Sequence, residues 1–251
     1  MIADATPWID ECLAAAGRER TGPVELFRER PWATVLKAPT TDGTVWFKAP
    51  SADTAFEVGL YGLLGRVAPE HVLVPLGVDR ERSWLLLPDG GAPLLEQASG
   101  ADRIAALEAV MPQYAELQRS VAPHVDELLA FGVADMRPAA MPARFDTAIA
   151  EIEGGQHVAS ARERFVAWCD ELDAGVGGAS IDHNDLHAEN ILPAPDGSVR
   201  FYDWGDSVVA HPFASMLVGL GAVIYTDKCP PDDARILRVR DAYLEAFTDL
   251  A

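Results

Sequence analysis

The stretch "IDHNDLHAENIL", residues 181–192, gathers histidine, asparagine, aspartate and glutamate side chains between aliphatic ends. Apolar ends around a polar middle are typical of a loop held between two short buried strands, an arrangement by which rigid elements present reactive groups. His183, Asp185 and Asn190 have the spacing H-x-D-x-x-x-x-N, and "FYDWGDS" places Asp203 thirteen residues after Asn190. These side chains are the first candidates for a functional site.

The set fits phosphoryl transfer to a hydroxyl group. That reaction needs an acceptor for the hydroxyl proton, hard oxygen ligands for Mg²⁺ and positive charge at the phosphates. We expect Asp185 to accept the proton, and Asn190 and Asp203 to be the metal ligands.

A lysine supplies a candidate for the positive charge. The chain has only three lysines, and Lys48 ends the strand-like stretch "TVWFK" among bulky apolar residues. Because a lysine in such a place needs a partner, Glu57 in the helix predicted next is the nearest suitable acid. A lysine on a strand paired with a glutamate on the following helix is typical of the small lobe of a kinase-type ATP site.

The surrounding sequence predicts two kinds of structure. Residues 22–50 alternate β-favouring stretches with turn signals such as Asp42-Gly43, which indicates an antiparallel meander, and a helix over 51–67 and two strands at 71–78 and 83–88 follow. After the Gly/Pro-rich stretch "DGGAPL", helical patterns predominate, near 101–119, 124–131, 140–152, 158–174, 212–226 and 232–248. We expect an α+β fold with a sheet-plus-helix lobe at 1–88 and a larger, mainly helical lobe at 89–251.

Composition limits the partners. The formal net charge of −19 opposes binding to nucleic acid or to an anionic membrane, and it favours a cationic ligand. Three dispersed cysteines predict no disulfide framework, hence a reducing compartment. The first seventeen residues predict a helix capped by Thr6 rather than an export signal, and no apolar run reaches the roughly 20 residues of a membrane span. We therefore expect a cytoplasmic protein.

Together, "HNDLHAEN", "YDWGD", "VWFK" and Glu57 resemble the aminoglycoside phosphotransferase and choline kinase branch of the protein-kinase-like fold, whose loop commonly reads H-G-D-L-H-x-x-N. The motifs agree in order from about residue 32 to about residue 215. The resemblance implies a two-lobed fold with ATP between the lobes and Mg²⁺ in the cleft. It also implies adenine bonded to the backbone around Leu86, Leu87 and Asp89, and transfer of the γ-phosphoryl group to the hydroxyl of a small molecule.

The sequence departs from that pattern in two places. The stretch "RERPWAT", residues 28–34, has no glycine run, so a glycine-rich cover over the phosphates is absent. The branch often has an aspartate in "P-x-x-D-L", whereas "HPFASML" has Ala214 and Ser215.

Two other classes of function compete with this interpretation. A metal-dependent hydrolase would use His183, Asp185 and His187, with Asp203 and His211, to hold Zn²⁺ or Mn²⁺ and activate water, but it leaves Lys48 and Glu57 unexplained. The other alternative is a non-catalytic binding protein built on a kinase scaffold.

The acceptor is the least determined part of the prediction. Several acids lie in the C-terminal part of the chain and would favour an amine-bearing acceptor such as an aminoglycoside, an amino sugar or a choline-like compound. They are Asp206, Asp227, Asp232, Asp233, Asp241, Glu245 and Asp249.

Overall fold

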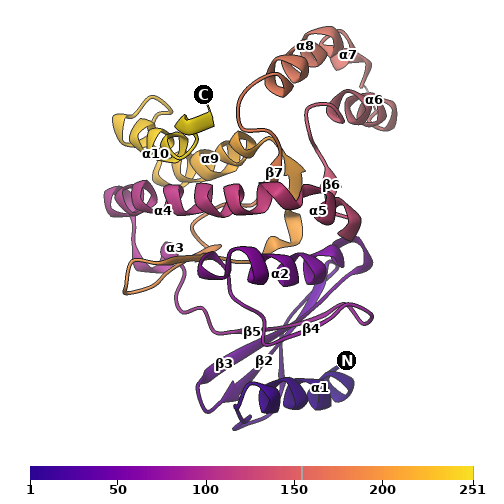
Figure 1. Ribbon diagram of the computed structural model, residues 1–251, viewed down its shortest axis with the longest axis vertical. Coiled ribbons are helices and arrows are strands. Elements are labelled where there is room, and N and C mark those ends of the chain that lie inside the picture. Colours follow the sequence, from indigo (N-terminus) through magenta and orange to yellow (C-terminus); the bar gives the residue numbers. More distant parts are fainter. Residues whose placement is uncertain (154, 251) are drawn as a thin grey trace. The chain divides into compact units, whose positions relative to one another are not determined.

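The chain forms two compact units in the computed structural model, which describes residues 1–153 and 155–250 (Figure 1). Met1–Ser99 and Ala188–Asp206 make up the first unit, and Gly100–His187 and Ser207–Ala251 make up the second. The polar stretch 181–192 therefore begins in the second unit and ends in the first.

The first unit is built on a five-stranded antiparallel sheet with the order β1-β2-β3-β5-β4. Its strands are β1 (Glu25–Arg30), β2 (Ala33–Thr40), β3 (Gly43–Pro50), β4 (Gly77–Asp79) and β5 (Trp84–Pro88). Thr40 pairs with Gly43, so β2 and β3 form a tight hairpin. Gly43 has a φ of 111°, which only glycine adopts without strain, and this explains the turn signal in the sequence.

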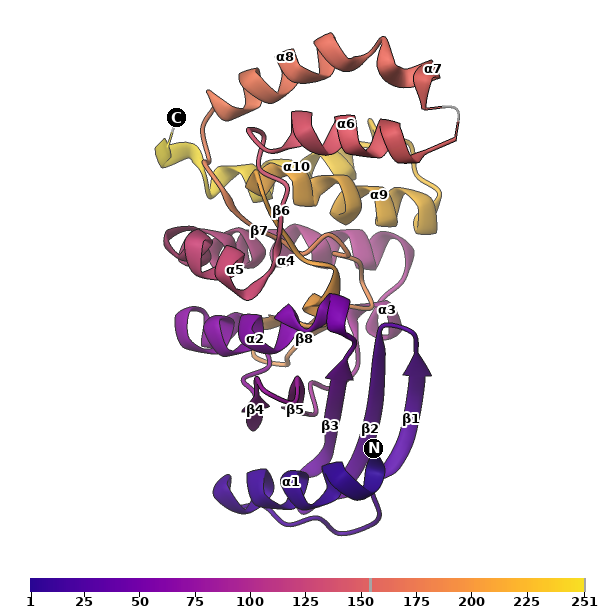
Figure 2. The same cartoon turned by 90° about the vertical axis from the view of Figure 1, so that its right-hand side faces the viewer.

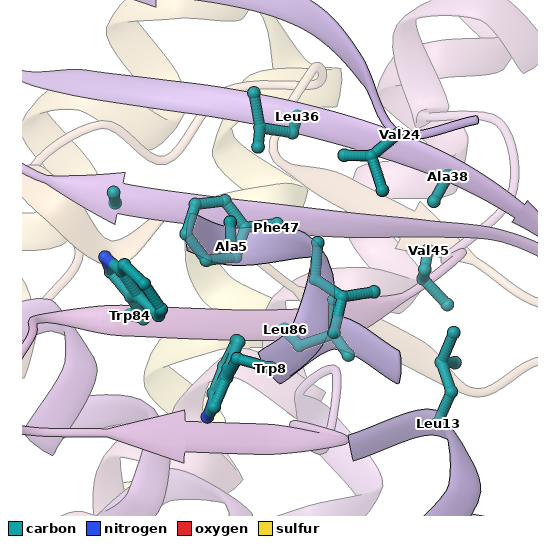
Figure 3. Close-up of a cluster of buried hydrophobic side chains, with 12 residues drawn as sticks. Ala5, Trp8, Leu13, Val24, Leu36, Ala38, Val45, Phe47, Trp84 and Leu86 are labelled. Atoms are coloured by element: carbon teal, nitrogen blue, oxygen red, sulfur yellow. The ribbon is translucent and has the colours of Figure 1, made fainter. Parts of the chain in front are cut away.

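Helix α1 (Ile2–Ala15) covers one face of this sheet (Figure 3). Trp8 from the helix meets Phe47 and Trp84 edge to face, with ring centroids 5.8 and 5.7 Å apart. Because side chains alternate along a strand, the burial of Val45 and Phe47 against α1 places Lys48 on the opposite face. The aromatic core thus fixes which way Lys48 points.

The opposite side of the first unit is formed by elements from both of its chain segments. Helix α2 (Phe56–Val67) follows the short 3-10 turn η1 (Ala52–Thr54), and α3 (Leu94–Gln97) lies near the end of the segment. Residues 188–206 return as the hairpin β8 (Ile191–Pro193) and β9 (Val199–Phe201), followed by the 3-10 turn η4 (Trp204–Asp206). Contacts between α2 and η4 bring Asp203 next to the helix that contains Glu57.

The second unit is mainly helical (Figure 2). It also has a small three-stranded sheet of order β6-β10-β7. The strands are β6 (Ala134–Asp135), β10 (Val208–Ala210) and β7 (Ser180–Asp182). Its helices are α4 (Gly100–Val121), α5 (Val125–Phe131), α6 (Met141–Glu151), α7 (Gln156–Ala159), α8 (Arg162–Asp173), α9 (Ser215–Asp227) and α10 (Ala234–Glu245). Helix α4 packs along α10, and α6 packs against α8 through stacked Phe145 and Phe165 rings 4.9 Å apart.

The α+β class predicted from the sequence is confirmed, and two local predictions were wrong. The strand expected over 71–78 shrinks to β4, because Pro75 interrupts the run and Val72 forms only a single bridge with Phe201. Helix α1 begins at Ile2 rather than after Thr6, whose hydroxyl donates to the Ile2 carbonyl at 2.8 Å inside the helix. Pro7 lies inside α1, where it removes one backbone hydrogen bond without ending the helix.

The predicted lobes, 1–88 and 89–251, are defined by the ligands they would bind, whereas the two compact units are defined by packing. The predicted division therefore stays a prediction. None of the described helices is both long and apolar enough to cross a membrane.

Candidate active site

Lys48 lies between two carboxylates. Its Nζ is 2.7 Å from Oε1 of Glu57 in α2 and 2.6 Å from Oδ1 of Asp203. The Glu57 side chain is fully buried, Lys48 is 16% exposed and Asp203 is 52% exposed. One cation is therefore shared by a buried acid and an acid that faces solvent. The partnership of Lys48 with Glu57 is the one expected from the sequence, and their role in nucleotide binding stays a prediction.

The charges of this cluster depend on one another. Burial alone would lower the pKa of Lys48, but the attraction of Glu57 and Asp203 outweighs it, so the pKa is raised and the ammonium stays charged. Burial raises the pKa of Glu57, and the nearby Lys48 charge opposes that rise. Removing Lys48 would leave a buried carboxyl group without its counter-charge.

Backbone conformation turns Asp203 toward the lysine. Asp203 has a φ of 63°, in the left-handed region that aspartate tolerates better than most residues. Its backbone N–H donates to the Tyr61 hydroxyl at 3.1 Å, which ties the turn to α2. Behind the ion pair, a side chain added at Gly205 would lie 3.5 Å from Oε2 of Glu57, so the next turn packs directly against the cluster.

Asn190 lies at the same end of the β8–β9 hairpin as Asp203. Ile191 pairs with Phe201, and the Tyr202 N–H donates to the Asn190 carbonyl at 3.2 Å, so Asn190 is opposite the residue before Asp203. An amide oxygen and a half-exposed carboxylate are hard oxygen donors of the kind that Mg²⁺ prefers. The donor set fits a magnesium site, and the role of both residues as metal ligands stays a prediction.

The sheet face that holds Lys48 has a second cation. Lys48 pairs with Val35 on β2, and Val35 pairs with Arg28 on β1, so the three side chains share one row and one face. A bulge between Leu26 and Arg28 brings Phe27 against the Trp46 ring, with centroids 4.9 Å apart. The row next to Lys48 thus presents aromatic surface.

The Arg28 charge also influences Tyr202, which follows β9 in the β8–β9 hairpin. Burial and the charges of Asp203 and Glu189 raise the pKa of Tyr202, and Arg28 opposes the rise. The Arg28 charge therefore acts on Tyr202, the residue that precedes Asp203.

The residues predicted to bond adenine lie at the end of β5 and just beyond it. Leu86 packs into the core under α1, Leu87 pairs with Trp46, and exposed Asp89 accepts the Gly91 N–H at 3.0 Å in a turn. Leucine side chains offer no hydrogen-bonding groups, so adenine would be bonded by backbone N–H and C=O groups here. The role of these three residues in adenine binding stays a prediction.

Asp185 follows the buried strand β7 in the second unit. The His183 N–H donates to the Tyr114 hydroxyl at 3.0 Å, and Asn184 takes a left-handed φ of 59°. After this turn the Asp185 side chain is 40% exposed. Nε2 of His187 lies 3.2 Å from Oδ2 of Asp185 and fixes one edge of the carboxylate.

The histidines of the hydrolase alternative have other roles. His211 Nε2 is 2.8 Å from the Val176 carbonyl, its Nδ1 accepts the Phe213 N–H at 3.3 Å, and burial lowers its pKa. His183 is fully buried. Within residues 1–153 and 155–250, no group of three or more His, Cys, Asp and Glu side chains is arranged to hold a metal ion. The hydrolase alternative therefore has no support.

Four of the seven C-terminal acids are paired with arginines. The pairs are Asp227 with Arg103 at 3.0 Å, and Asp233 with Arg235, Asp241 with Arg240 and Asp249 with Arg119, each at 2.6 Å. Their charges are locally compensated, which weakens the reason for expecting a cationic acceptor.

The predicted site residues fall into two sets. Lys48, Glu57, Asn190 and Asp203 belong to the first unit, together with Leu86, Leu87 and Asp89, whereas Asp185 belongs to the second. Sequence reasoning missed Arg28, which shares the Lys48 row, and Asp182, a buried acid that ends β7 and accepts the Ser215 hydroxyl at 2.6 Å. An arginine where glycine was expected was a signal for Arg28, and an acid inside the apolar strand "SID" was a signal for Asp182.

No protein-family profile and no curated protein sequence matches the chain. Solved structures do match. The macrolide 2'-phosphotransferase MphH from Brachybacterium faecium is 16% identical with a TM-score of 0.60, over 96% of this chain and 82% of that one. Choline kinase LicA from Streptococcus pneumoniae is 15% identical with a TM-score of 0.61, over 97% of this chain and 80% of that one.

A third structure is the amicoumacin kinase hAmiN in complex with AMP-PNP, Ca²⁺ and Ami. It is 12% identical with a TM-score of 0.58, over 100% of this chain and 80% of that one. Likeness at such low identity concerns the backbone and leaves the substrate open. The chain has the protein-kinase-like fold of these small-molecule phosphotransferases.

Proposed function

We propose that the protein is a small-molecule kinase that transfers the γ-phosphoryl group of ATP to a hydroxyl group of its acceptor. The contact of Lys48 with both Glu57 and Asp203 supports this more than any other observation. A partly buried lysine held by a helical acid is suited to bind the α- and β-phosphates, and a half-exposed acid beside it is suited to bind the accompanying cation.

Asn190 and Asp203 would hold Mg²⁺. A bound Mg²⁺ would neutralise phosphate charge, which is the chemistry it supplies in this class of reaction. The similar amicoumacin kinase was crystallised with Ca²⁺, another cation that prefers oxygen ligands, together with AMP-PNP. Asp203 would bind the cation more strongly than Asn190 because it contributes a full negative charge.

The nucleotide base would lie against the Lys48 face of the sheet, near the backbone of Leu86 and Leu87 in β5 and of Asp89 just beyond it. Trp46 and Val35 add apolar surface on the same face. Two of the similar structures contain GDP and another contains AMP, so GTP is tested beside ATP.

Asp185 would act as the general base. As the acceptor oxygen forms its bond to the γ-phosphorus, the bond to the β–γ bridging oxygen breaks and ADP leaves. The hydroxyl proton moves to the Asp185 carboxylate, whose Oδ2 lies 3.2 Å from Nε2 of His187.

For the acceptor, we propose a small hydroxyl compound, with amine-bearing compounds such as aminoglycosides or amino sugars as the first class to test. The net charge of −19 favours a cation over an anion, although arginines compensate part of the C-terminal acid. If the acceptor is a cation, kcat/KM must fall as ionic strength rises, whereas a flat salt profile would indicate a neutral acceptor.

Other partners and functions have less support. A non-catalytic binding protein would not need a proton acceptor, a phosphate-binding lysine and two oxygen ligands together. The negative charge disfavours nucleic acid and anionic membranes as partners. All three cysteines are free thiols, consistent with a cytoplasmic location, which stays a prediction.

The direct test is nucleotide consumption with ATP and with GTP against a panel of aminoglycosides, choline-like amines, sugars and nucleosides. Mass spectrometry and phosphorus NMR would locate the transferred phosphoryl group. Asp185→Asn is the control for contaminating kinases, because this variant should keep the fold but lose transfer. Transfer that is unchanged in Asp185→Asn would contradict the proposed mechanism.

A further inference from the structure

Asp182 is a buried acid at the centre of a hydrogen-bond network in the second unit. It ends strand β7 and is 5% exposed. Its Oδ1 accepts the Ser215 hydroxyl at 2.6 Å and the Asn184 N–H at 2.9 Å. The mechanism described above does not use this carboxylate.

The network has a defined direction. The Tyr114 hydroxyl accepts the His183 N–H at 3.0 Å, so its own proton is available for Ser215 Oγ, 2.9 Å away. The Gln118 amide also donates to Ser215 Oγ, at 3.1 Å. Because Ser215 receives these donors, its own proton points to Asp182, at the end of the chain of donors.

Other buried groups hold the donors in place. The Tyr243 hydroxyl donates to Oε1 of Gln118 at 2.6 Å, and the Ser180 hydroxyl donates to the Gln118 carbonyl at 2.6 Å. Tyr114, Gln118, Ser215 and Tyr243 are all fully buried. Donors aligned on one acid stabilise a charge there better than an isolated hydrogen bond would.

The carboxylate also sets the backbone that leads to Asp185. By accepting the Asn184 N–H, Asp182 closes the turn in which Asn184 has a left-handed φ of 59°. Such a conformation in a residue other than glycine persists only where the surroundings hold it. The next residue is Asp185.

We propose that Asp182, the acid of this network, is the positioning residue for Asp185 through its hydrogen bonds with Ser215 and the Asn184 backbone. This inference rests on the proposed function. It also accounts for the missing aspartate of the "P-x-x-D-L" pattern: the acid lies at the other end of the same hydrogen bond, on β7 instead of at the start of α9. A single negative charge in this network is required, and either end of the bond can supply it.

Exchange of the two residues tests the proposal. In Asp182→Ser/Ser215→Asp, the new carboxyl group at position 215 can accept from Tyr114, Gln118 and the hydroxyl at position 182. That hydroxyl can still accept the Asn184 N–H, so every donor keeps an acceptor. Asp182→Ser alone removes the charge, and Ser215→Asp alone places two acids within hydrogen-bond distance. Thr40→Ala is the matched control, because it removes a buried hydroxyl that donates to the Gly43 carbonyl at 2.8 Å in the β2–β3 hairpin, outside the Asp182 network.

Two quantities are measured on each variant: turnover of ATP with the best acceptor, and the affinity for ADP. Asp182→Ser and Ser215→Asp should each lower kcat roughly 10-fold to 100-fold with an unchanged ADP affinity, since a misplaced base slows the chemical step. The exchange variant should return to within about 3-fold of the wild-type kcat, because the two changes are strongly coupled. Thr40→Ala should lower the urea midpoint without lowering kcat, because its hydroxyl serves only the hairpin.

Wild-type kcat in Asp182→Ser, or an exchange variant no better than the worse single variant, would overturn the proposal. If the wild-type chain transfers no phosphoryl group, the proposed function fails, and the urea midpoints of the same proteins still decide the exchange. Recovery of the midpoint in the double variant then supports the Asp182–Ser215 coupling, and no recovery overturns it.

Discussion

Replacing Lys48 with methionine separates the structural part of the ion cluster from its part in nucleotide binding. The change removes the counter-charge of Glu57, whose side chain is fully buried and 2.7 Å from the lysine. Breaking a buried pair by removing one partner costs about 3–5 kcal/mol, because the other charge stays desolvated. We expect Lys48→Met to lower the free energy of unfolding by this amount near neutral pH.

The loss should depend on pH in one direction. Burial already raises the pKa of Glu57, and without Lys48 nothing opposes that rise. A carboxyl group whose pKa is raised in the folded state is fully tolerated below its unfolded pKa and destabilises as pH rises toward the folded pKa. The penalty should therefore grow by up to about 1.4 kcal/mol per pH unit above about pH 4.3, until the folded pKa is reached.

Urea unfolding at about pH 5.5 and about pH 8.5 measures this difference for the wild type and Lys48→Met, since both pH values lie above the ordinary pKa of a glutamate in an unfolded chain. The companion Lys48→Met/Glu57→Gln replaces the buried acid by a neutral side chain of similar shape. We expect it to regain much of the stability at the higher pH but to bind ATP as weakly as Lys48→Met. A stability loss that is equal at both pH values would refute the buried-charge reasoning, and wild-type ATP affinity in the companion would refute the phosphate role of Lys48.

Three further predictions concern the candidate site. Asp185→Asn should keep nucleotide affinity while kcat falls roughly 10²-fold to 10⁴-fold, and near-normal turnover would show that another group is the base. Asp203→Ala should lose more activity than Asn190→Ala, and added Mg²⁺ should restore the asparagine variant better; a metal titration of both variants tests this ranking. Arg28→Gln should weaken ATP and ADP binding but not adenosine binding in calorimetry, because Arg28 shares a row and a face with Lys48. Lys37→Gln removes the same charge from the next row, and an equal loss in both variants would indicate only a net-charge effect.

Spacing along the chain was enough to predict the contact of Lys48 with Glu57. A lysine ending an apolar strand can point only to one of two sheet faces, and the next helix supplies an acid on one of them. Alternation along β3 also decides the face on which Lys48 lies. Val45 and Phe47 pack under α1, so Trp46 and Lys48 lie on the other face. Local rules of this kind operate over short separations, which is why the small sheet was largely predictable.

The network around Asp182 could not be predicted in the same way. Its members come from β7, α4, α9 and α10, so the hydrogen bonds join residues as far apart as Gln118 and Tyr243. No periodicity of one segment indicates which distant hydroxyl meets which acid. The prediction of a strand over 71–78 was wrong for a related reason. Pro75 interrupts the run, and Val72 pairs only with Phe201, which is distant in the sequence.

The two departures from the family pattern have a common physical explanation. A buried site constrains the charge and the hydrogen-bond donors that meet at a point, and several placements of residues satisfy the same constraint. Ser215 stands where an acid is usual, yet its hydroxyl donates to Asp182 at 2.6 Å, so the charge is kept and only its position along the bond has changed. We propose the same kind of substitution for Arg28, which shares the Lys48 row: its guanidinium would contact the phosphates in place of the backbone amides of a glycine-rich loop. A chain that lacks one residue of a sequence motif has therefore lost the chemistry of that residue only if no residue nearby in space supplies the same chemical group.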